Sequence, residues 1–261
     1  MGNLNLKIPK VIHYCWFGGQ PLSPLAIYCI NSWKKFCPDY QIIRWDESNT
    51  DLNTCQFVRE AFELQKWAFV SDYIRLKVIE EFGGIYLDID VELLTNLDSF
   101  LFHDGFMSFE YDRTHCKINT GLGFGSIPHH PIIKELLNNY ENRSFIKLDK
   151  TLDTEPCPQR DTKVLVKLGL IENGLKQSIN GFIFYPSDYF CPISFYGERN
   201  FTKNTVSIHH FNASWLSEDI QNDIERKKKL ISLFGYHLGR CVNIIFKVKD
   251  YLLKIVRQHY K

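Results

Sequence analysis

The sequence contains no run of about 18 consecutive apolar residues, the length that a helix needs to cross a bilayer. Its first ten residues, MGNLNLKIPK, are polar and hold no apolar stretch of the kind that marks a secretory signal peptide. We therefore expect a protein that has no membrane-spanning helix and remains in the cytoplasm.

The eight cysteines form no CxxC pair and no spacing typical of a zinc site. Without a secretory signal, this pattern predicts reduced thiols rather than disulfides. The chain also lacks internal repeats and low-complexity linkers. With 261 residues, of which 44% are hydrophobic, it is long enough for one large domain or for one domain with an appendage.

The charge is unevenly distributed, although the net charge is only +1. Residues 226–261 hold ten basic residues and one acidic residue, a net charge of +9, whereas the rest holds 21 basic and 29 acidic residues, a net charge of −8. We therefore divide the chain into an acidic domain over residues 1–225 and a basic tail over residues 226–261.

The basic tail has the spacing of an amphipathic helix. Apolar residues recur there in alternating steps of three and four, and several basic residues fall opposite them, at Arg240, Lys247, Lys254, Arg257 and Lys261. Such a helix is typical of an anionic membrane surface, which would make the protein peripheral on the inner face of the cytoplasmic membrane. The alternative is a terminal helix packed on the core. Nucleic acid is not an expected partner, because the basic charge lies opposite an apolar stripe.

Strands and helices alternate along the first half of the chain. KVIHYCWF and QIIRWD read as strands, with a helix between them from Pro24 to Phe36, and residues 55–82 have helical spacing up to a glycine pair. Further strands are expected at GFMSFE, INTGLGFGS and TVSIHHF, and a helix at HHPIIKELLNNYE. Residues 144–204 give no clear pattern. The order predicts an α/β fold.

The stretch GGIYLDIDVELL places carboxylates inside an apolar, strand-like run. On one continuous strand, Asp88, Asp90 and Glu92 would share a face, and the two aspartates would lie near the carboxyl end, where α/β sheets bind ligands. Neighbouring carboxylates repel each other unless a cation lies between them, which favours Mg²⁺ or Mn²⁺. A solvated polar strand face is the alternative.

The segment WAFVSDYIRLKVIEEFGGIYLDIDVELL resembles the signature of glycosyltransferase family 32, the DXD-containing sugar transferases of bacterial capsule and lipopolysaccharide synthesis and of the fungal Golgi. The blocks IPKVIHYCWFGG, INTGLGFG and SIHHFNASWL extend the resemblance over residues 7–217. It implies a GT-A-type nucleotide-sugar-binding fold with a mixed, mainly parallel sheet, a divalent metal, and transfer with retention of configuration.

The resemblance also implies roles for individual residues. Trp16 would stack on the nucleotide base, although an indole at this place also suits core packing. Asp72 and Arg75 would bind the donor sugar and its phosphates, although residues three apart on a helix also pair with each other. Asp88 would reach the ribose and the donor sugar, and Asp90 would be a metal ligand. Asn119 would lie near the donor sugar.

The motif IHHFNASW completes the implied site. By the family spacing His210 is the third metal ligand, with His209 as the alternate, because neighbouring strand residues point to opposite faces. Ser214 and Trp215 would close over the diphosphate.

The function implied is the transfer of a hexose from a UDP- or GDP-sugar to a glycan or lipid-linked saccharide acceptor, in bacterial capsule or O-antigen synthesis. Asp88, Asp90 and Arg75 would form the catalytic set. No carboxylate nucleophile can be assigned, so a front-face transfer is preferred to a double displacement. The alternatives are a Mg²⁺-dependent phosphohydrolase or nucleotidyltransferase, or a non-catalytic protein that binds nucleotide sugars.

Overall fold

The computed structural model describes residues 6–212 and 218–259. In these residues a seven-stranded sheet has the order β2-β1-β3-β6-β5-β8-β7, and β4 and β9 form a separate two-stranded sheet. The strands are β1 Val11–Cys15, β2 Gln41–Trp45, β3 Gly84–Tyr86, β4 Val91–Leu93, β5 Gly105–Ser108, β6 Phe124–Ser126, β7 Gln177–Ile179, β8 Phe182–Tyr185 and β9 Ser207–His209.

The larger sheet is mixed, with three parallel and three antiparallel pairings. Five of its seven strands run in one direction, and only β6 and β7 run against them. The expected mixed, mainly parallel sheet is therefore present. Because β1 and β3 are parallel neighbours, their carboxyl ends meet at one edge of the sheet.

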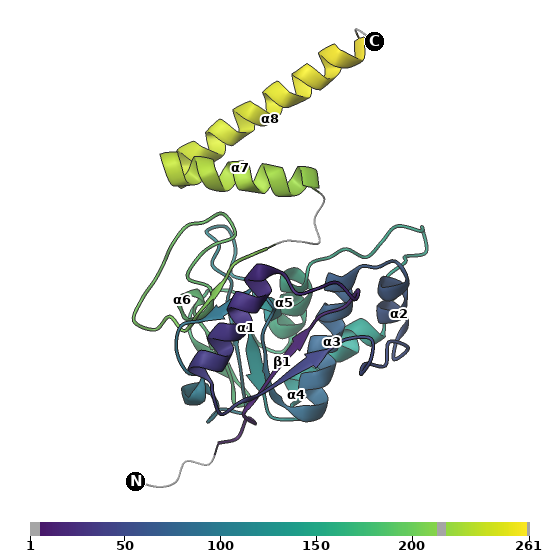
Figure 1. The fold of residues 1–261 in the computed structure, drawn as a ribbon, viewed down its shortest axis with the longest axis vertical. Helices are drawn as coiled ribbons and strands as arrows, with labels where there is room; N and C mark the ends of the chain where they lie inside the picture. The colour runs from purple at the N-terminus through teal and green to yellow at the C-terminus, as the bar shows by residue number, and fades with distance from the viewer. Residues whose placement is uncertain (1–5, 213–217, 260–261) are drawn as a thin grey trace.

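Helices cover both faces of this sheet (Figure 1). They are α1 Pro24–Phe36, α2 Gln56–Glu63, α3 Trp67–Phe82, α4 Pro131–Glu141, α5 Cys157–Lys167 and α6 Ser187–Phe190, with short 3₁₀ turns at Asp98–Phe100 and Thr120–Leu122. One hydrophobic cluster joins α2, α3 and α4 to the sheet, and a second joins α1 to the opposite face. Strand β3 contributes Ile85 to one cluster and Tyr86 to the other, as the two-residue period of a strand requires.

Local sequence explains where the helices begin and end. Pro24 begins α1 as predicted, because the Ser23 hydroxyl accepts the free backbone N–H of Ala26 at 3.1 Å. Helix α3 ends at Gly83, whose φ of 65° lies in the left-handed region that glycine adopts at low cost. Gly84 then starts β3 directly, so a buried helix leads into the aspartate segment without a loop.

The tail forms two helices where a single continuous one was expected. Helix α7 spans Glu218–Phe234 and α8 spans Tyr236–His259, and between them Gly235 has a φ of 76° that ends the first helix. Helix α7 begins before the predicted boundary at residues 225 and 226, which falls inside it. Helix α7 lies above the body of the molecule, and α8 extends away from it (Figure 1).

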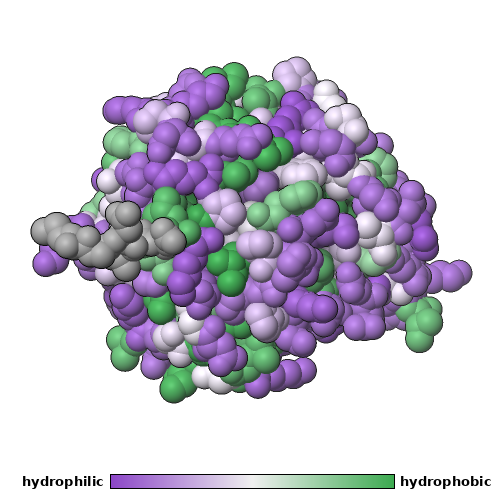
Figure 2. All heavy atoms as spheres, turned by 90° about the horizontal axis from the view of Figure 1, so that it is seen from below, coloured by the Kyte–Doolittle hydropathy of each residue, from purple (hydrophilic) through white to green (hydrophobic). Residues whose placement is uncertain are grey.

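None of the described helices is both long enough and apolar enough to cross a membrane. The face of the molecule opposite the two tail helices is predominantly hydrophilic, with apolar side chains in separate small groups (Figure 2).

Candidate active site around the aspartate pair

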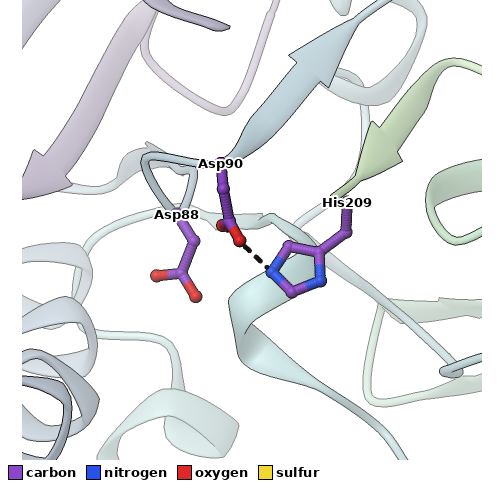
Figure 3. A group of neighbouring side chains, drawn as sticks. All are labelled: Asp88, Asp90 and His209. Atoms are coloured by element: carbon purple, nitrogen blue, oxygen red, sulfur yellow. Dashed lines mark ion pairs between the residues drawn. The ribbon is translucent and has the colours of Figure 1, made fainter. Parts of the chain in front are cut away.

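The aspartate segment is a turn between two sheets, which corrects the expectation of one continuous strand. Strand β3 ends at Tyr86 and β4 begins at Val91, whose N–H donates to the carbonyl oxygen of Asp88 at 2.9 Å. The turn leaves both aspartate side chains on one side of the chain (Figure 3). On one continuous strand, their Cα atoms would lie about 6.6 Å apart. The pair therefore lies at the carboxyl end of β3, at the sheet edge where ligands are expected.

Strand β9 carries a histidine to the same place. It pairs antiparallel with β4 and sets His209 opposite Val91, next to Asp90. The His209 Nε2 atom lies 3.2 Å from Asp90 Oδ1, and one ligand atom each of Asp88, Asp90 and His209 lie within 4.8 Å of one another. Figure 3 shows the three side chains converging from the turn and from the end of β9.

The electrostatics of this cluster are those of buried opposite charges. Burial opposes ionisation of Asp90, but the charge and hydrogen bond of His209 and the N–H of Asn212, at 2.8 Å, outweigh it and lower the pKa of Asp90. Burial likewise opposes the charge on His209, and Asp90 outweighs it, so the pKa of His209 is raised. The raised pKa favours the imidazolium form of His209, whose positive charge offsets part of the carboxylate charge.

Arg75 supports the first aspartate from α3. Its Nη2 atom lies 2.9 Å from Asp72 Oδ1 and 3.3 Å from Asp88 Oδ1, and the Tyr86 hydroxyl donates to the same Asp88 oxygen at 2.9 Å. Burial raises the pKa of both carboxyl groups despite the guanidinium that they share. Asp72 and Arg75 pair with each other, and Arg75 also reaches Asp88 in the aspartate segment. Binding of the donor sugar and its phosphates by these two residues stays a prediction.

Asn119 and Gly121 complete the floor of the site. A Cβ atom at Gly121 would lie 2.5 Å from Asp88 Oδ2 and 3.0 Å from Asn119 Oδ1, so only glycine leaves room for these groups. Asn119 donates its amide to Glu110 Oε2 at 2.7 Å and accepts the N–H of Gly121 at 2.7 Å. The predicted INTG position therefore lies beside Asp88, although Thr120–Leu122 form a 3₁₀ turn and only Phe124–Ser126 of the expected strand form β6.

The three converging side chains fit a divalent metal. Two carboxylates and one imidazole are suitable ligands for a hard or intermediate cation, and the imidazole nitrogen favours Mn²⁺ over Mg²⁺. Within the described residues, the Nδ1 atom of His209 is buried without a hydrogen-bond partner, and Nε2 is the ring nitrogen that faces Asp90. As a metal ligand, His209 would give up its Nε2 proton and coordinate through that nitrogen. The raised pKa of Asp88 shows that Arg75 alone does not compensate for its burial.

The structure places the alternate histidine, His209, beside the aspartate pair. His209 faces Asp90, whereas the His210 ring lies 3.0 Å from Glu92 Oε2, and the other oxygen of Glu92 accepts the Tyr28 hydroxyl at 2.6 Å. His210 was the first choice because of its spacing to Trp215, but the pairing of β4 with β9 decides which ring faces the turn. Glu92 is likewise directed away from the aspartate pair, because the turn at 87–90 changes the register.

Trp16 lies at the same edge of the sheet, just after β1. Its indole N–H donates to the carbonyl oxygen of Gln20, and its ring packs partly against the second hydrophobic cluster. Stacking on a base stays a prediction. Ser214 and Trp215 lie outside the described residues.

Sequence reasoning missed three residues that border the site. Glu110 follows β5, and burial raises its pKa against the opposing effects of Asn119 and His209. Cys157 and Asp161 come from α5, in the region that gave no pattern; the Cys157 sulfur lies 3.9 Å from Arg75 Nη1. Only Glu110 carried a signal, as a carboxylate at the end of the expected strand GFMSFE. The other two are brought in by the packing of α4 against α5.

Comparison with known proteins identifies the region that holds this site. Residues 23–107 match the family model described as "glycosyltransferase sugar-binding region containing DXD motif". Inositol phosphoceramide mannosyltransferase 2 of Schizosaccharomyces pombe is 26% identical over 157 residues, which are 52% of this chain and 39% of that protein. An uncharacterized glycosyltransferase, L373, of Acanthamoeba polyphaga mimivirus is 26% identical over 222 residues, which are 80% of this chain and 84% of that protein.

This chain thus spans about two fifths of the length of the yeast relative and most of the viral one. Among solved structures, the PaToxG glycosyltransferase has a TM-score of 0.48 at 20% identity, over 61% of this chain and 69% of that chain. The galactosyltransferase LgtC has a TM-score of 0.40 at 14% identity, over 82% and 94%.

The mixed, mainly parallel sheet with the DXD region at its edge is the predicted GT-A-type fold. More specifically, residues 23–107 match the sugar-binding region of DXD-containing glycosyltransferases, which confirms the predicted resemblance to that family.

Proposed function

We propose that this protein transfers a hexose, with retention of configuration, from a UDP- or GDP-sugar to a hydroxyl group of a glycan or lipid-linked saccharide. The observation that carries the proposal is the convergence of Asp88, Asp90 and His209 within the DXD region. The buried Arg75 network beside them supplies the fixed charge that a departing diphosphate needs.

Each described residue then has a role. Asp90 and His209 would hold the metal, and Asp88 would contact the metal and the donor. A bound Mn²⁺ or Mg²⁺ supplies charge neutralisation for the diphosphate leaving group. Arg75 holds Asp88 in position and stabilises negative charge on the donor side. Asn119, fixed between Glu110 and Gly121, offers a rigid polar contact to the sugar.

Retention is compatible with a front-face transfer. In that reaction the acceptor oxygen bonds to the anomeric carbon as the bond to the diphosphate oxygen breaks, and the hydroxyl proton passes to the departing diphosphate. Within the described residues, Glu110 is the further carboxylate nearest to Asn119, and a double displacement would use such a group as its nucleophile. Glu110→Gln distinguishes the two routes, because only the double displacement requires an ionised carboxylate there.

A lipid-linked acceptor is the acceptor class that we favour. The yeast relatives are named as mannosyltransferases of inositol phosphoceramide, a lipid. The tail helices also leave large apolar side chains exposed, at Leu233, Phe234, Leu238, Ile244, Ile245 and Val248. We propose that these helices bind an anionic membrane at the inner face of the cytoplasmic membrane. A role in capsule or O-antigen synthesis stays a prediction.

The experiment that tests the activity is a donor panel. Purified protein would be incubated with UDP- and GDP-hexoses, with Mn²⁺ or with EDTA, and the released nucleoside diphosphate and sugar products would be measured. We expect metal-dependent release of UDP or GDP from one nucleotide class. Release of a nucleoside monophosphate or of inorganic phosphate would instead indicate the phosphohydrolase alternative. Binding of a donor without any turnover, across acceptors, would indicate a non-catalytic binding protein.

A further inference from the structure

Helix α7 contacts the body of the molecule next to the candidate active site. The Lys227 ammonium lies 3.2 Å from the centre of the Tyr196 ring, and the Lys228 ammonium lies 5.7 Å from the centre of the Phe195 ring. Both rings belong to the loop between α6 and β9. These are the distances of cation–π contacts, and they fix α7 above that loop.

A continuous row of packed rings leads from Lys228 to the metal-binding residues. Phe195 packs edge-on against Phe211 with 5.4 Å between ring centres, and Phe211 packs edge-on against His209 with 4.3 Å between ring centres. His209 in turn pairs with Asp90. Phe211 has a φ of 50°, in the left-handed region that is costly for a bulky side chain. The surrounding contacts therefore hold this ring in place, and the row is a fixed part of the site.

Lys228 is less exposed than the lysine that follows it on α7. It is half-buried, whereas the adjacent Lys229 is exposed. Burial lowers the pKa of Lys228, and the carboxylates that oppose this effect are Glu225, on its own helix, and Asp90, in the site. An ammonium group that is partly removed from water gains more from an added anion than an exposed one does.

We propose that Lys228 binds the diphosphate of the nucleotide-sugar donor, so that α7 forms one wall of the donor site. This inference rests on the proposed function. Arg75, which pairs with Asp88, would contact this diphosphate from α3, and Lys228 would contact it from α7. Lysine binds phosphate as a mobile point charge, which suits a contact made from a neighbouring helix.

The test is calorimetric binding of UDP and GDP, each in the presence of Mn²⁺, to the full chain and three variants. Lys228→Met keeps the apolar stem over Phe195 but removes the charge, and we expect its affinity for the nucleoside diphosphate to fall roughly 10-fold or more. Lys228→Arg should restore most of the affinity, and Lys229→Met, on the exposed face, should bind like the unmodified protein. Mn²⁺ binding alone should be equal in all four proteins.

The outcomes separate the two proposals. If the unmodified protein binds UDP or GDP and Lys228→Met binds equally well, Lys228 has no role in the donor site and the proposed function stands. If Lys228→Met weakens Mn²⁺ binding as much as nucleotide binding, the residue acts on the metal ligands and the phosphate contact is wrong. If the unmodified protein binds neither nucleotide with Mn²⁺, both proposals are overturned.

Discussion

At the scale of single residues, the main question is which of two adjacent histidines binds the metal with the aspartates. His209 faces Asp90 in a buried position, and His210 faces Glu92 on the other side of β9. We predict that His209→Ala weakens Mn²⁺ binding about 10-fold or more, because one of three protein ligands is lost. His210→Ala should change it less than 2-fold. Titration of Mn²⁺ against each variant, followed by electron paramagnetic resonance of the free ion, measures both values.

The opposite result for the two histidine variants would contradict this prediction. Loss of Mn²⁺ binding in His210→Ala, with His209→Ala unaffected, would mean that β9 pairs with β4 in a register shifted by one residue. The family spacing to Trp215 would then be the better guide.

A second prediction at this scale concerns Asp161. Burial raises the pKa of this carboxyl to about 7, and the Thr120 hydroxyl donates to it at 2.9 Å. Because the folded state binds the proton more tightly than the unfolded chain, whose pKa is 3.8, stability should fall as pH rises from about 4 to about 7. The limiting slope is roughly 1.4 kcal/mol per pH unit.

Asp161→Asn keeps an acceptor for Thr120 and removes the titrating proton. We expect this variant to lose that part of the pH dependence and to gain stability at pH 8. Urea unfolding at pH 5 and pH 8 would show it. An unchanged difference between the two pH values would mean that Asp161 is ionised in the folded protein.

At the scale of helices and strands, local sequence signals predicted the helices and strands well. Pairings between strands far apart in the sequence could not be predicted from such signals. The helix predicted from about Pro24 to Phe36 has these bounds in the structure, where a serine cap and a proline mark its start. The aspartate run was read as one strand, because its apolar alternation continues through the turn at 87–90. Only the pairing of β4 with β9, over a hundred residues apart, breaks that strand, and no local pattern reports it.

The residues of the candidate site also differ in whether the sequence could predict them. The aspartates, Arg75 and Asn119 could be predicted, because short motifs on neighbouring elements carry them. Cys157 and Asp161 could not, because α5 follows a proline-rich stretch and reaches the site only through tertiary packing. The tail was read as one helix, although Gly235 divides it.

His13 provides a prediction at the scale of elements. Its ring joins three of them: Nε2–H donates to the carbonyl oxygen of Gly83 at 3.0 Å, and Nδ1 accepts the indole N–H of Trp45 at 3.0 Å. Burial lowers the pKa of His13 to about 4, so the ring is neutral. The contribution of His13 to the free energy of unfolding should therefore be complete above about pH 6.5. It should fall as the pH drops from 6.5 toward 4, because in that range only the unfolded chain takes up the proton.

His13→Ala should cost roughly 2–4 kcal/mol at pH 7, because two buried hydrogen-bonding groups lose their partner. It should also reduce the loss of stability between pH 6.5 and pH 5. Urea unfolding of this variant beside His237→Ala, an exposed position on α8, provides the comparison. A cost below 0.5 kcal/mol would show that the ring does not hold these elements together.

At the scale of the whole molecule, an acidic body carries a basic pair of helices. The apolar stripe expected in the tail is exposed at Phe234, Leu238, Ile245 and Val248 rather than packed on the core. We predict that the protein sediments with vesicles of anionic lipid, less with neutral vesicles, and less as salt increases. Leu238→Glu combined with Ile245→Glu should abolish sedimentation.

Ile171→Glu is the matched control, because Ile171 is 63% exposed and lies on the body rather than on the tail. Equal sedimentation of the tail variant and the control would show that the tail does not contact lipid. The stripe would then be available for another partner.

The central claim is that the aspartate pair binds a metal and a nucleotide sugar together. The most direct test is the thermal unfolding of the full chain with UDP-glucose, UDP-galactose and GDP-mannose, each with and without Mn²⁺. At a hundredfold excess over the dissociation constant, binding adds about 2.7 kcal/mol and raises Tm by roughly 5 °C or more. We predict such a shift for one nucleotide class, only with Mn²⁺, and none in Asp90→Ala. A shift that is equal without Mn²⁺ or in Asp90→Ala, or no shift with any donor, would contradict the claim.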